Sequence, residues 1–337
     1  MRKINGVPVE AHTDLSNLTG GEVLKWSGTN MAWEDQDDSA YVPLAAATGE
    51  QGHFTTGGHG HANITNLITI NTAANATTGA TLSTDAYNNG ACSNQTRGVI
   101  VGGRNSSTYY NRMEYITFSS IGGGTDFGDL TTARGYTRGT SNQSNDRGVI
   151  AGGFSGSTTN IIEYITISTT GNATDFGDMT SSYYFPGMTS NGVNDRALLT
   201  NGQVSSYNII DYITISTTGN ATDFGDLTTT RKCDAQVSND INNRAVFAGD
   251  RSTANMEYVN IASTGNASSF GNLIVAFDGG GSVSNGTNDR GVFSAGEDIP
   301  GYTNEIEYIT ISTTGNSTDF GDMTSSYQGW SSCSGAA

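Results

Sequence analysis

Short runs of alternating apolar and polar residues recur along most of this chain. In the clearest run, Glu163-Tyr164-Ile165-Thr166-Ile167, an extended strand places Ile165 and Ile167 on one face and Tyr164 and Thr166 on the other. Both faces carry bulky or β-branched side chains, which favours a strand that is partly buried on both sides. Because the apolar residues are grouped in such runs, the pattern predicts a folded all-β protein and not a disordered chain.

The same run repeats at a regular spacing. Its other copies begin at residues 66, 114, 211, 257 and 307, and the positions equivalent to Tyr164 are 67, 115, 212, 258 and 308, a period of roughly 46–50 residues. A fixed period of this length is the sequence signature of a β-propeller blade. We therefore expect each repeat to be one four-stranded sheet.

The third repeat divides cleanly into four strands. The pattern predicts strands at 135–142, 147–153, 161–168 and 173–180, separated by turns at Asn145-Asp146 and 169–172 and by one loop of variable length.

Counting the copies predicts how the ring closes. The Arg-Gly-Val-Ile type of second strand occurs five times, and a divergent sixth version is present at 52–58. The first unit lacks its own first strand, while the chain ends on an unpaired strand at 327–336, in which Cys333 aligns with Cys92. We expect six blades, with the C-terminal strand completing the first and removing exposed sheet edges.

Composition and charge narrow the function classes. Only 14% of the residues are charged and the net charge is −17, which argues against nucleic-acid binding because phosphate backbones are repelled. No apolar run approaches 18 residues, and no apolar stretch follows Met1-Arg2-Lys3, so neither a membrane span nor a secretory signal is expected. The three cysteines are expected to be free thiols.

The two faces of the predicted disc differ in sequence. One face carries the monotonous turns between strands one and two and between strands three and four, and the other carries loops of variable length. Function tends to lie on variable loops that a repeated scaffold positions, although such loops can also drift freely. Aromatic residues suited to a sugar or protein surface lie in these loops, and we expect them to form the binding site: Tyr109, Tyr110, Tyr183, Tyr184, Phe185, Tyr207, Tyr302 and Trp330.

Charged and metal-ligating residues need structural explanations as well as functional ones. The repeated Arg and Asp predict ion pairs within blades and not a catalytic role: Arg97 with Asp126, Arg147 with Asp175, Arg196 with Asp223 and Arg290 with Asp319. The pair His59 and His61 fits either a metal site or a glycine-rich junction. No Ser/His/Asp or Cys/His set converges, so we expect no enzyme, no cofactor and no assigned metal.

Residues 1–50 share none of the repeat. Leu24, Trp26 and Trp33 lie in two short predicted strands around Ser27-Gly28, and the apolar content is too small for independent folding. We expect an attachment segment at 1–50 and a propeller at 51–337, with these three side chains docking onto a partner or onto other copies.

Two resemblances extend this interpretation. Gly152-Gly153, Tyr164, Thr170-Gly171-Asn172 and the arginines Arg134 and Arg231 resemble the kelch repeat over roughly residues 51–337, with Phe176 where kelch has its tryptophan. Residues 18–26 and 164–178 resemble segments of bacteriophage tail-fibre-like and marine phage structural proteins.

The second resemblance implies a virion surface protein, made in the host cytoplasm, that binds a host glycan or receptor and other virion proteins. It implies no nucleic-acid partner and no membrane insertion, and it allows a homo-oligomer. A capsid decoration protein without a receptor role is the alternative. A secreted carbohydrate-active propeller is disfavoured by the missing signal.

Overall fold

The computed structural model describes residues 3–4, 7–8, 23–26, 31–34, 50–55, 63–120, 122–142, 146–192, 194–200, 202, 207–233, 235–240, 242–284, 289–294, 296–298, 301–326 and 331–334. The chain divides into two units, Met1–Ala45 and Ala46–Ala337. Within the described ranges, no helix is both long enough and apolar enough to cross a membrane.

The first unit contains two antiparallel strand pairs. In one, β1 (Lys3–Ile4) pairs with β2 (Val7–Pro8), and in the other β3 (Val23–Trp26) pairs with β4 (Met31–Glu34). The second pair is the hairpin that the sequence predicts: Leu24 and Trp26 lie in β3, and Trp33 lies in β4 opposite Leu24. The side chains of these three residues lie outside the described part of the structure.

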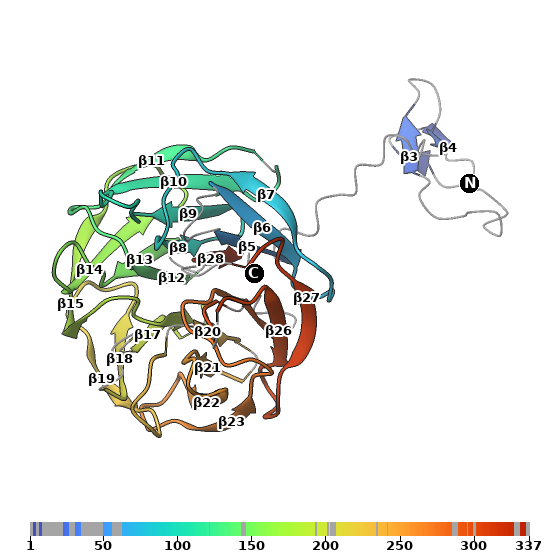
Figure 1. Ribbon diagram of the computed structural model, residues 1–337. Helices are drawn as coiled ribbons and strands as arrows, with labels where there is room; N and C mark the ends of the chain where they lie inside the picture. Colours follow the sequence, from blue (N-terminus) through green and yellow to red (C-terminus); the bar gives the residue numbers. More distant parts are fainter. Residues whose placement is uncertain are drawn as a thin grey trace. The chain divides into compact units, whose positions relative to one another are not determined.

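The second unit is a propeller of six antiparallel four-stranded blades (Figure 1), which confirms the predicted fold. From inside outward, blade 1 is β28 (Ser332–Ser334), β5 (Gln51–Thr55), β6 (Ile64–Thr69) and β7 (Thr77–Thr81); blade 2 is β8 (Gly90–Ser93), β9 (Arg97–Val101), β10 (Arg112–Thr117) and β11 (Thr125–Asp129); blade 3 is β12 (Arg138–Asn142), β13 (Arg147–Ala151), β14 (Thr159–Thr166) and β15 (Thr174–Tyr183). Blade 4 is β16 (Met188–Ser190), β17 (Arg196–Thr200), β18 (Ile209–Thr214) and β19 (Thr222–Asp226); blade 5 is β20 (Ala235–Ser238), β21 (Arg244–Ala248), β22 (Asn255–Asn260) and β23 (Ser268–Asn272); blade 6 is β24 (Ser282–Ser284), β25 (Arg290–Ser294), β26 (Glu305–Thr310) and β27 (Thr318–Asp322).

The C-terminal strand closes the ring as predicted. Strand β28 pairs with β5, with Cys333 opposite His53, so the last and first strands of the propeller share one sheet. The Thr55 amide donates to the Ser331 carbonyl at 2.8 Å, and the two side-chain hydroxyls lie 2.9 Å apart. The described parts are Gln51–Thr55 and Ser332–Ser334, and residues 56–58, 327–330 and 335–336 of the expected strands at 52–58 and 327–336 lie outside the described structure.

The core lies between the faces of adjacent blades. One face of blade 2, with Val101 and Phe127, packs against Ile150 and Ile165 of blade 3 in a single buried cluster. Tyr115 lies at the margin of the cluster and meets Phe127 edge-on at 6.3 Å. The predicted alternation is therefore correct, and a phenylalanine provides the aromatic group of the fourth strand.

A glycine in each fourth strand of blades 2 to 6 lets the next blade approach. Gly177 has φ +146°, and a Cβ there would lie 2.5 Å from the Gly219 carbonyl oxygen of the following blade. At the same contact the Gly219 amide donates to the Phe176 carbonyl at 2.8 Å, and Asn220 Oδ1 accepts from the Asp178 amide at 3.0 Å. Because Gly lacks a Cβ, it permits this backbone-to-backbone contact.

The predicted Arg–Asp ion pairs are wrong. Among the described residues, Arg97, Arg147, Arg196 and Arg290 form no salt bridge with the expected aspartates. In blade 3, Arg147 lies opposite Thr166, whereas Asp175 lies opposite Glu163. Because neighbouring residues of a strand point to opposite sides, these pairings place Asp175 on the other face of the sheet from Arg147.

Each of these arginines instead ties two blades together. The Arg147 guanidinium stacks 4.3 Å above the centre of the Tyr164 ring and donates to the Ile215 carbonyl of blade 4 at 2.9 Å. The same arrangement recurs in four other blades, at Arg97 with Tyr115, Arg196 with Tyr212, Arg244 with Tyr258 and Arg290 with Tyr308.

Candidate binding surface

The repeat face comprises the one–two and three–four turns of the blades, and its repeated polar residues bind one another. Asp146 accepts from Asn94 Nδ2 of blade 2 at 2.7 Å and from the Ser168 amide of its own blade at 3.0 Å. Asp195 and Asp289 repeat these contacts, and all three have φ near +50°, a conformation that Asp and Asn tolerate better than other non-glycine residues. The polar residues of this face are thus explained by structure alone.

A second set of acids is buried inside the blades, at the position preceding the repeated tyrosine. Glu163 is fully buried and binds the Arg134 guanidinium and the Thr131 amide, which belong to the loop entering its blade. Burial raises the pKa of the equivalent Glu307 and Asp211 carboxyls, although hydrogen bonds to each act in the opposite direction. These acids anchor the four–one loops from below and are not open to a ligand.

The variable face comprises the two–three and four–one loops, and it carries a group of half-buried rings from blades 2 and 3 and the loop that leads into blade 4. The Tyr136 ring is the centre of this group: Phe154 meets it edge-on at 6.2 Å, and Tyr184 meets it edge-on at 6.0 Å. Tyr109 contacts Phe154 in turn at 6.0 Å. We call the whole group the aromatic patch, and its members are Tyr87, Arg104, Tyr109, Tyr136, Phe154 and Tyr184.

Arg104 supplies the positive charge of the aromatic patch. Its guanidinium carbon lies 5.2 Å from the ring centre of Tyr109, 5.6 Å from that of Tyr87 and 5.9 Å from that of Tyr136. It also donates to the Tyr136 hydroxyl at 3.1 Å. Burial lowers the pKa of Arg104, but this hydrogen bond and the surrounding tyrosines outweigh it and raise the pKa overall, so the group stays charged.

The backbone below the aromatic patch is held in an unusual conformation. Tyr136 has φ +60° and Phe185 has φ +51°, values that cost a bulky residue on the order of 1–3 kcal/mol. Backbone hydrogen bonds hold both residues, since the Phe185 amide donates to the Tyr136 carbonyl at 2.7 Å and the Tyr136 amide donates to the Asn88 carbonyl at 2.5 Å. The rings are thus positioned before any ligand arrives.

The structure separates the eight predicted binding residues into groups. Tyr109 and Tyr184 belong to the aromatic patch, and Tyr110 lies beside it, with its hydroxyl accepting from Asn105 at 2.7 Å. Tyr207 and Tyr302 are exposed by 44% and 47%, the former in edge contact with Tyr183 and the latter in blade 6. Trp330 lies outside the described residues.

Tyr183 and Phe185 are not surface residues, which corrects their assignment as binding residues. They are only 2% and 3% exposed, and burial is the main cause of a raised Tyr183 pKa. Tyr183 closes strand β15 within the blade 3–blade 4 core, and Phe185 packs against Tyr136 at 4.9 Å and under the Arg138 guanidinium at 4.4 Å. Phe185 thus supports the aromatic patch from below, whereas Tyr183 belongs to the core between blades 3 and 4.

Four patch residues were missed by the sequence analysis, namely Tyr87, Arg104, Tyr136 and Phe154. Arg104 and Phe154 begin variable two–three loops, and Tyr87 and Tyr136 lie where a four–one loop enters a blade. A signal existed, because the four–one loops that lead into three successive blades carry aromatic residues, at Tyr87, at Tyr136 and at Tyr183-Tyr184-Phe185. Only the fold shows that these loops are neighbours.

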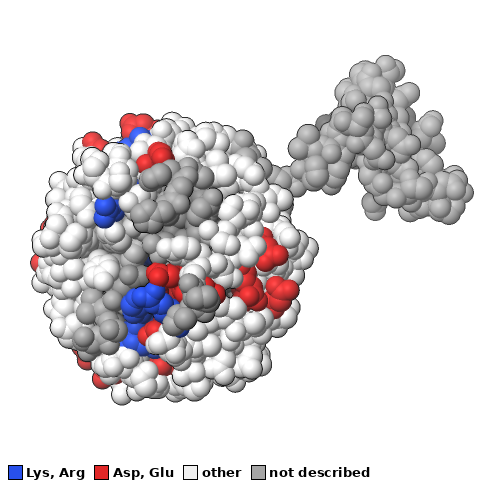
Figure 2. Space-filling model, viewed as in Figure 1, with Lys and Arg blue, Asp and Glu red and all other residues white. Residues whose placement is uncertain are grey.

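Charge is sparse on the propeller face shown in Figure 2, where Lys and Arg form a few small groups beside Asp and Glu. The variable loops contain a mixed charged group of four residues. Lys232 Nζ lies 2.5 Å from an Asp278 carboxylate oxygen, and Arg251 lies 3.7 Å from the same carboxylate and also pairs with Glu297. In the described part of the chain, no group of three His, Cys, Asp or Glu side chains could hold a metal ion. His59 and His61 lie outside that part.

Comparison with known proteins bears on the fold alone. No protein-family model matches the chain, and no curated protein matches it. Among the solved structures that match is a fungal alcohol oxidase of the AA5 family in complex with copper, at 16% identity and a TM-score of 0.56. The match covers 84% of this chain and 65% of the oxidase, so the two proteins share an architecture.

Proposed function

We propose that this protein is a bacteriophage virion surface protein of the tail-fibre type, which binds and does not catalyse. In this proposal the first unit attaches to the particle through Leu24, Trp26 and Trp33, and the propeller presents its variable face to a host glycan or receptor. The virion part of the proposal rests on the resemblance of residues 18–26 and 164–178 to phage proteins. The observation that carries the binding role is the aromatic patch, a set of half-buried and prepositioned rings around one arginine on the loop face of a rigid ring.

The chemistry of the aromatic patch suits a sugar or a polar protein surface. Tyrosine rings supply contact area at little cost in conformational entropy, and their hydroxyls and the neighbouring Ser and Asn side chains supply hydrogen bonds. Ser106, Ser107 and Thr108 are exposed beside Tyr109. The patch also lies on the face whose loops are free to change, because the repeated polar residues that join the blades lie on the other side.

A capsid decoration protein is the second candidate, and the closed ring favours it. Arginine bridges, asparagine caps and strand β28 join neighbouring blades around the circle, as a protein that stiffens a shell would require. In that case the aromatic patch would contact another virion protein.

Two measurements on the intact protein test the proposal. Immunogold labelling should place the chain on phage particles, and an array of bacterial envelope glycans should capture the purified chain. Capture should fail for the double variant Tyr109→Ala/Tyr184→Ala and persist for Tyr302→Ala, an exposed tyrosine outside the patch. Label on the particle without glycan or host-cell capture would favour the decoration role, and absence of label would refute both.

A further inference from the structure

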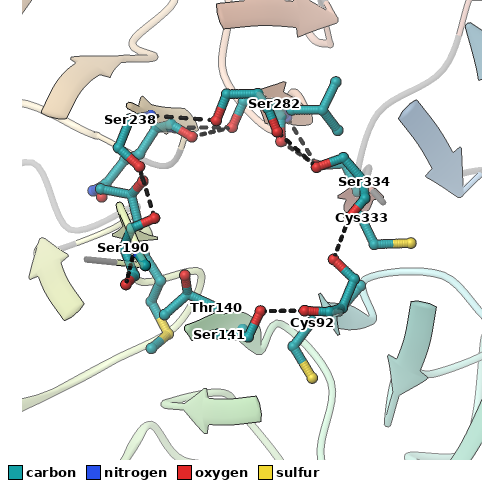
Figure 3. Close-up of a pocket in the computed structure, with 18 of the residues that line it drawn as sticks. Cys92, Thr140, Ser141, Ser190, Ser238, Ser282, Cys333 and Ser334 are labelled. Atoms are coloured by element: carbon teal, nitrogen blue, oxygen red, sulfur yellow. Dashed lines mark hydrogen bonds between the residues drawn. The ribbon is translucent and has the colours of Figure 1, made fainter. Parts of the chain in front are cut away.

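Two places on the propeller present polar groups to a ligand, the central channel and the aromatic patch. The channel contains a cavity of about 120 Å³ (Figure 3), which is the volume of roughly four water molecules at about 30 Å³ each. The serine hydroxyls of its lining bind neighbouring backbone carbonyls around the ring, as Ser93 does to Ser334 at 2.7 Å and Ser334 does to Ser284 at 2.8 Å. A sugar ring therefore does not fit the channel, whereas the aromatic patch lies open at the surface.

The positive charge of the aromatic patch has no acidic partner. The Arg104 guanidinium donates to the Asn105 carbonyl at 2.9 Å and to the Ser106 carbonyl at 3.3 Å. It also donates to the Tyr136 hydroxyl at 3.1 Å, so these acceptors are all neutral. None of the ion pairs between described residues includes Arg104, whereas Arg251, in another variable loop, pairs with two acids. The charge of Arg104 is thus left for a ligand to compensate.

The tyrosine hydroxyls around Arg104 accept hydrogen bonds and keep their protons available. Tyr136 Oη accepts from Arg104, and Tyr110 Oη accepts from Asn105 Nδ2 at 2.7 Å. Tyr109 Oη lies 3.5 Å from a nitrogen of Arg104. Among the described residues, no acceptor takes the protons of these three hydroxyls. Because hydrogen bonds in a chain polarise one another, a hydroxyl that is bound to a cation donates more strongly. The patch therefore presents donors around a positive charge.

We infer that the aromatic patch binds an acidic glycan, with a sugar carboxylate at Arg104 and the neighbouring hydroxyls. An ionised carboxylate only accepts hydrogen bonds, so it complements a surface of donors, and hydrogen bonds to ionised groups are roughly twice as strong as neutral ones. The single uncompensated arginine matches the single charge of a sugar carboxylate. This inference rests on the proposed function and names the class of glycan that the variable face recognises.

The rest of the patch fits a sugar that carries this carboxylate. Tyr109, Phe154 and Tyr184 are half-buried and uncharged, so their rings supply contact area for the sugar. The net charge of −17 repels an anion at long range, but at physiological ionic strength this repulsion is screened beyond about 8 Å. The charges within the patch therefore decide which ligand binds.

Glycan capture by the full chain tests the inference. The probes are bacterial capsular polysaccharides that contain uronic acids, each in its native form and after chemical reduction of its carboxyl groups to alcohols, beside neutral envelope glycans and poly-glutamate. The native forms should bind at least about tenfold more tightly than the reduced forms, because the charge-assisted hydrogen bonds are lost with the carboxylate.

The other outcomes separate this inference from the proposed function. Equal capture of the native and reduced forms, or capture of neutral glycans or poly-glutamate in their place, would overturn the acidic glycan and leave a binding role of the variable face intact. Capture of no probe at all would overturn the acidic glycan together with the role in glycan binding.

Three variants assign the preference to Arg104. Arg104→Gln should bind the native and reduced forms equally, and Arg104→Lys should keep part of the preference because it keeps the charge. Arg251→Gln is the matched control, since it removes one positive charge from another variable loop, and it should bind like the parent chain. A full preference in Arg104→Gln, or an equal loss in Arg251→Gln, would contradict the site.

A fourth variant guards against a folding defect in Arg104→Gln, because Arg104 also binds two carbonyls of its own loop. Tyr136→Phe leaves Arg104 and these carbonyl contacts in place and removes one donor of the patch. It should weaken capture of the native forms more than capture of the reduced forms, with melting curves confirming that the chain is folded. An unchanged preference in Tyr136→Phe would contradict the donor role of the hydroxyl.

Discussion

Replacing Arg147 by Met should destabilise the propeller by about 2 kcal/mol. The substitution removes the guanidinium 4.3 Å above Tyr164, worth about 0.5–1 kcal/mol for a partly exposed cation–π contact. It also removes the 2.9 Å hydrogen bond to the Ile215 carbonyl, and bonds from charged donors contribute about 1.5–3 kcal/mol before allowance for solvent. Methionine keeps the aliphatic part of the side chain, so the decrease in the free energy of unfolding measures the contribution of the guanidinium group.

Urea unfolding followed by circular dichroism measures this loss, and Asp175→Asn is the matched control. Asp175 is exposed and lies on the other face of the sheet, so its substitution should change the free energy of unfolding by no more than about 0.5 kcal/mol. Equal destabilisation by the two variants would support an ion pair between Arg147 and Asp175 after all. An Arg147→Met protein as stable as the parent would refute a stabilising contact of Arg147 with the neighbouring blade.

Three further predictions concern the ring. Deleting residues 326–337 removes β28 and leaves β5 unpaired on its inner edge, so the propeller should lose its cooperative melting transition; a truncated chain that melts like the intact one would contradict closure by this strand. Gly177→Ala should lower the free energy of unfolding by at least about 1–3 kcal/mol, because its φ is +146° and the new Cβ would meet the Gly219 carbonyl. Gly171→Ala is the control and should be near neutral, because a Cβ there meets nothing within 4 Å. Equal effects of the two substitutions in urea unfolding would rule out the close approach of the blades. Burial lowers the pKa of His53 from 6.5 to about 4, so between these pH values the unfolded chain binds a proton that the folded chain does not. The free energy of unfolding should therefore fall by about 3 kcal/mol as the pH drops from 6.5 to 4. His53→Gln should remove this acid dependence, and a variant that keeps it would show that another group is the cause.

The sequence predicted the architecture because each blade repeats the same local pattern. The alternation around Tyr164, the Gly-Asn turns and the orphan strand at the C-terminus are properties of single repeats or of their count. The structure follows them, down to the pairing of β28 with β5. A single repeat could not show that Arg147 contacts the neighbouring blade, because the hydrogen-bond acceptor is a backbone carbonyl 68 residues away.

The binding surface was predicted only in part, for the same reason. Residues repeated in most blades have structural roles, as predicted, and binding by the variable loops stays a prediction. Which loop aromatics share a surface depends on the geometry between blades, so Tyr109 and Tyr184 were found while Tyr136 was missed. The burial of individual loop residues could not be predicted from the sequence either. Tyr183, Tyr184 and Phe185 are consecutive, but only Tyr184 reaches the surface.

The most direct test of the functional account compares the two faces in one experiment. Attachment to host cells and the melting temperature are measured for a variable-face variant with Tyr109, Tyr110, Tyr184 and Tyr207 changed to alanine, and for a repeat-face variant, Asn172→Ala/Asn220→Ala. The first variant should lose attachment and still melt in one cooperative transition, because its side chains add contact area for a ligand and lie outside the core between blades. Its melting temperature should fall only by the loss of ring contacts such as Tyr184 with Tyr136 and Tyr109 with Phe154. The second should keep attachment and melt lower, because Asn172 and Asn220 each accept a hydrogen bond from the neighbouring blade at 3.0 Å. Full attachment by the tyrosine variant, or equal loss of attachment from both, would contradict a binding face on the variable loops.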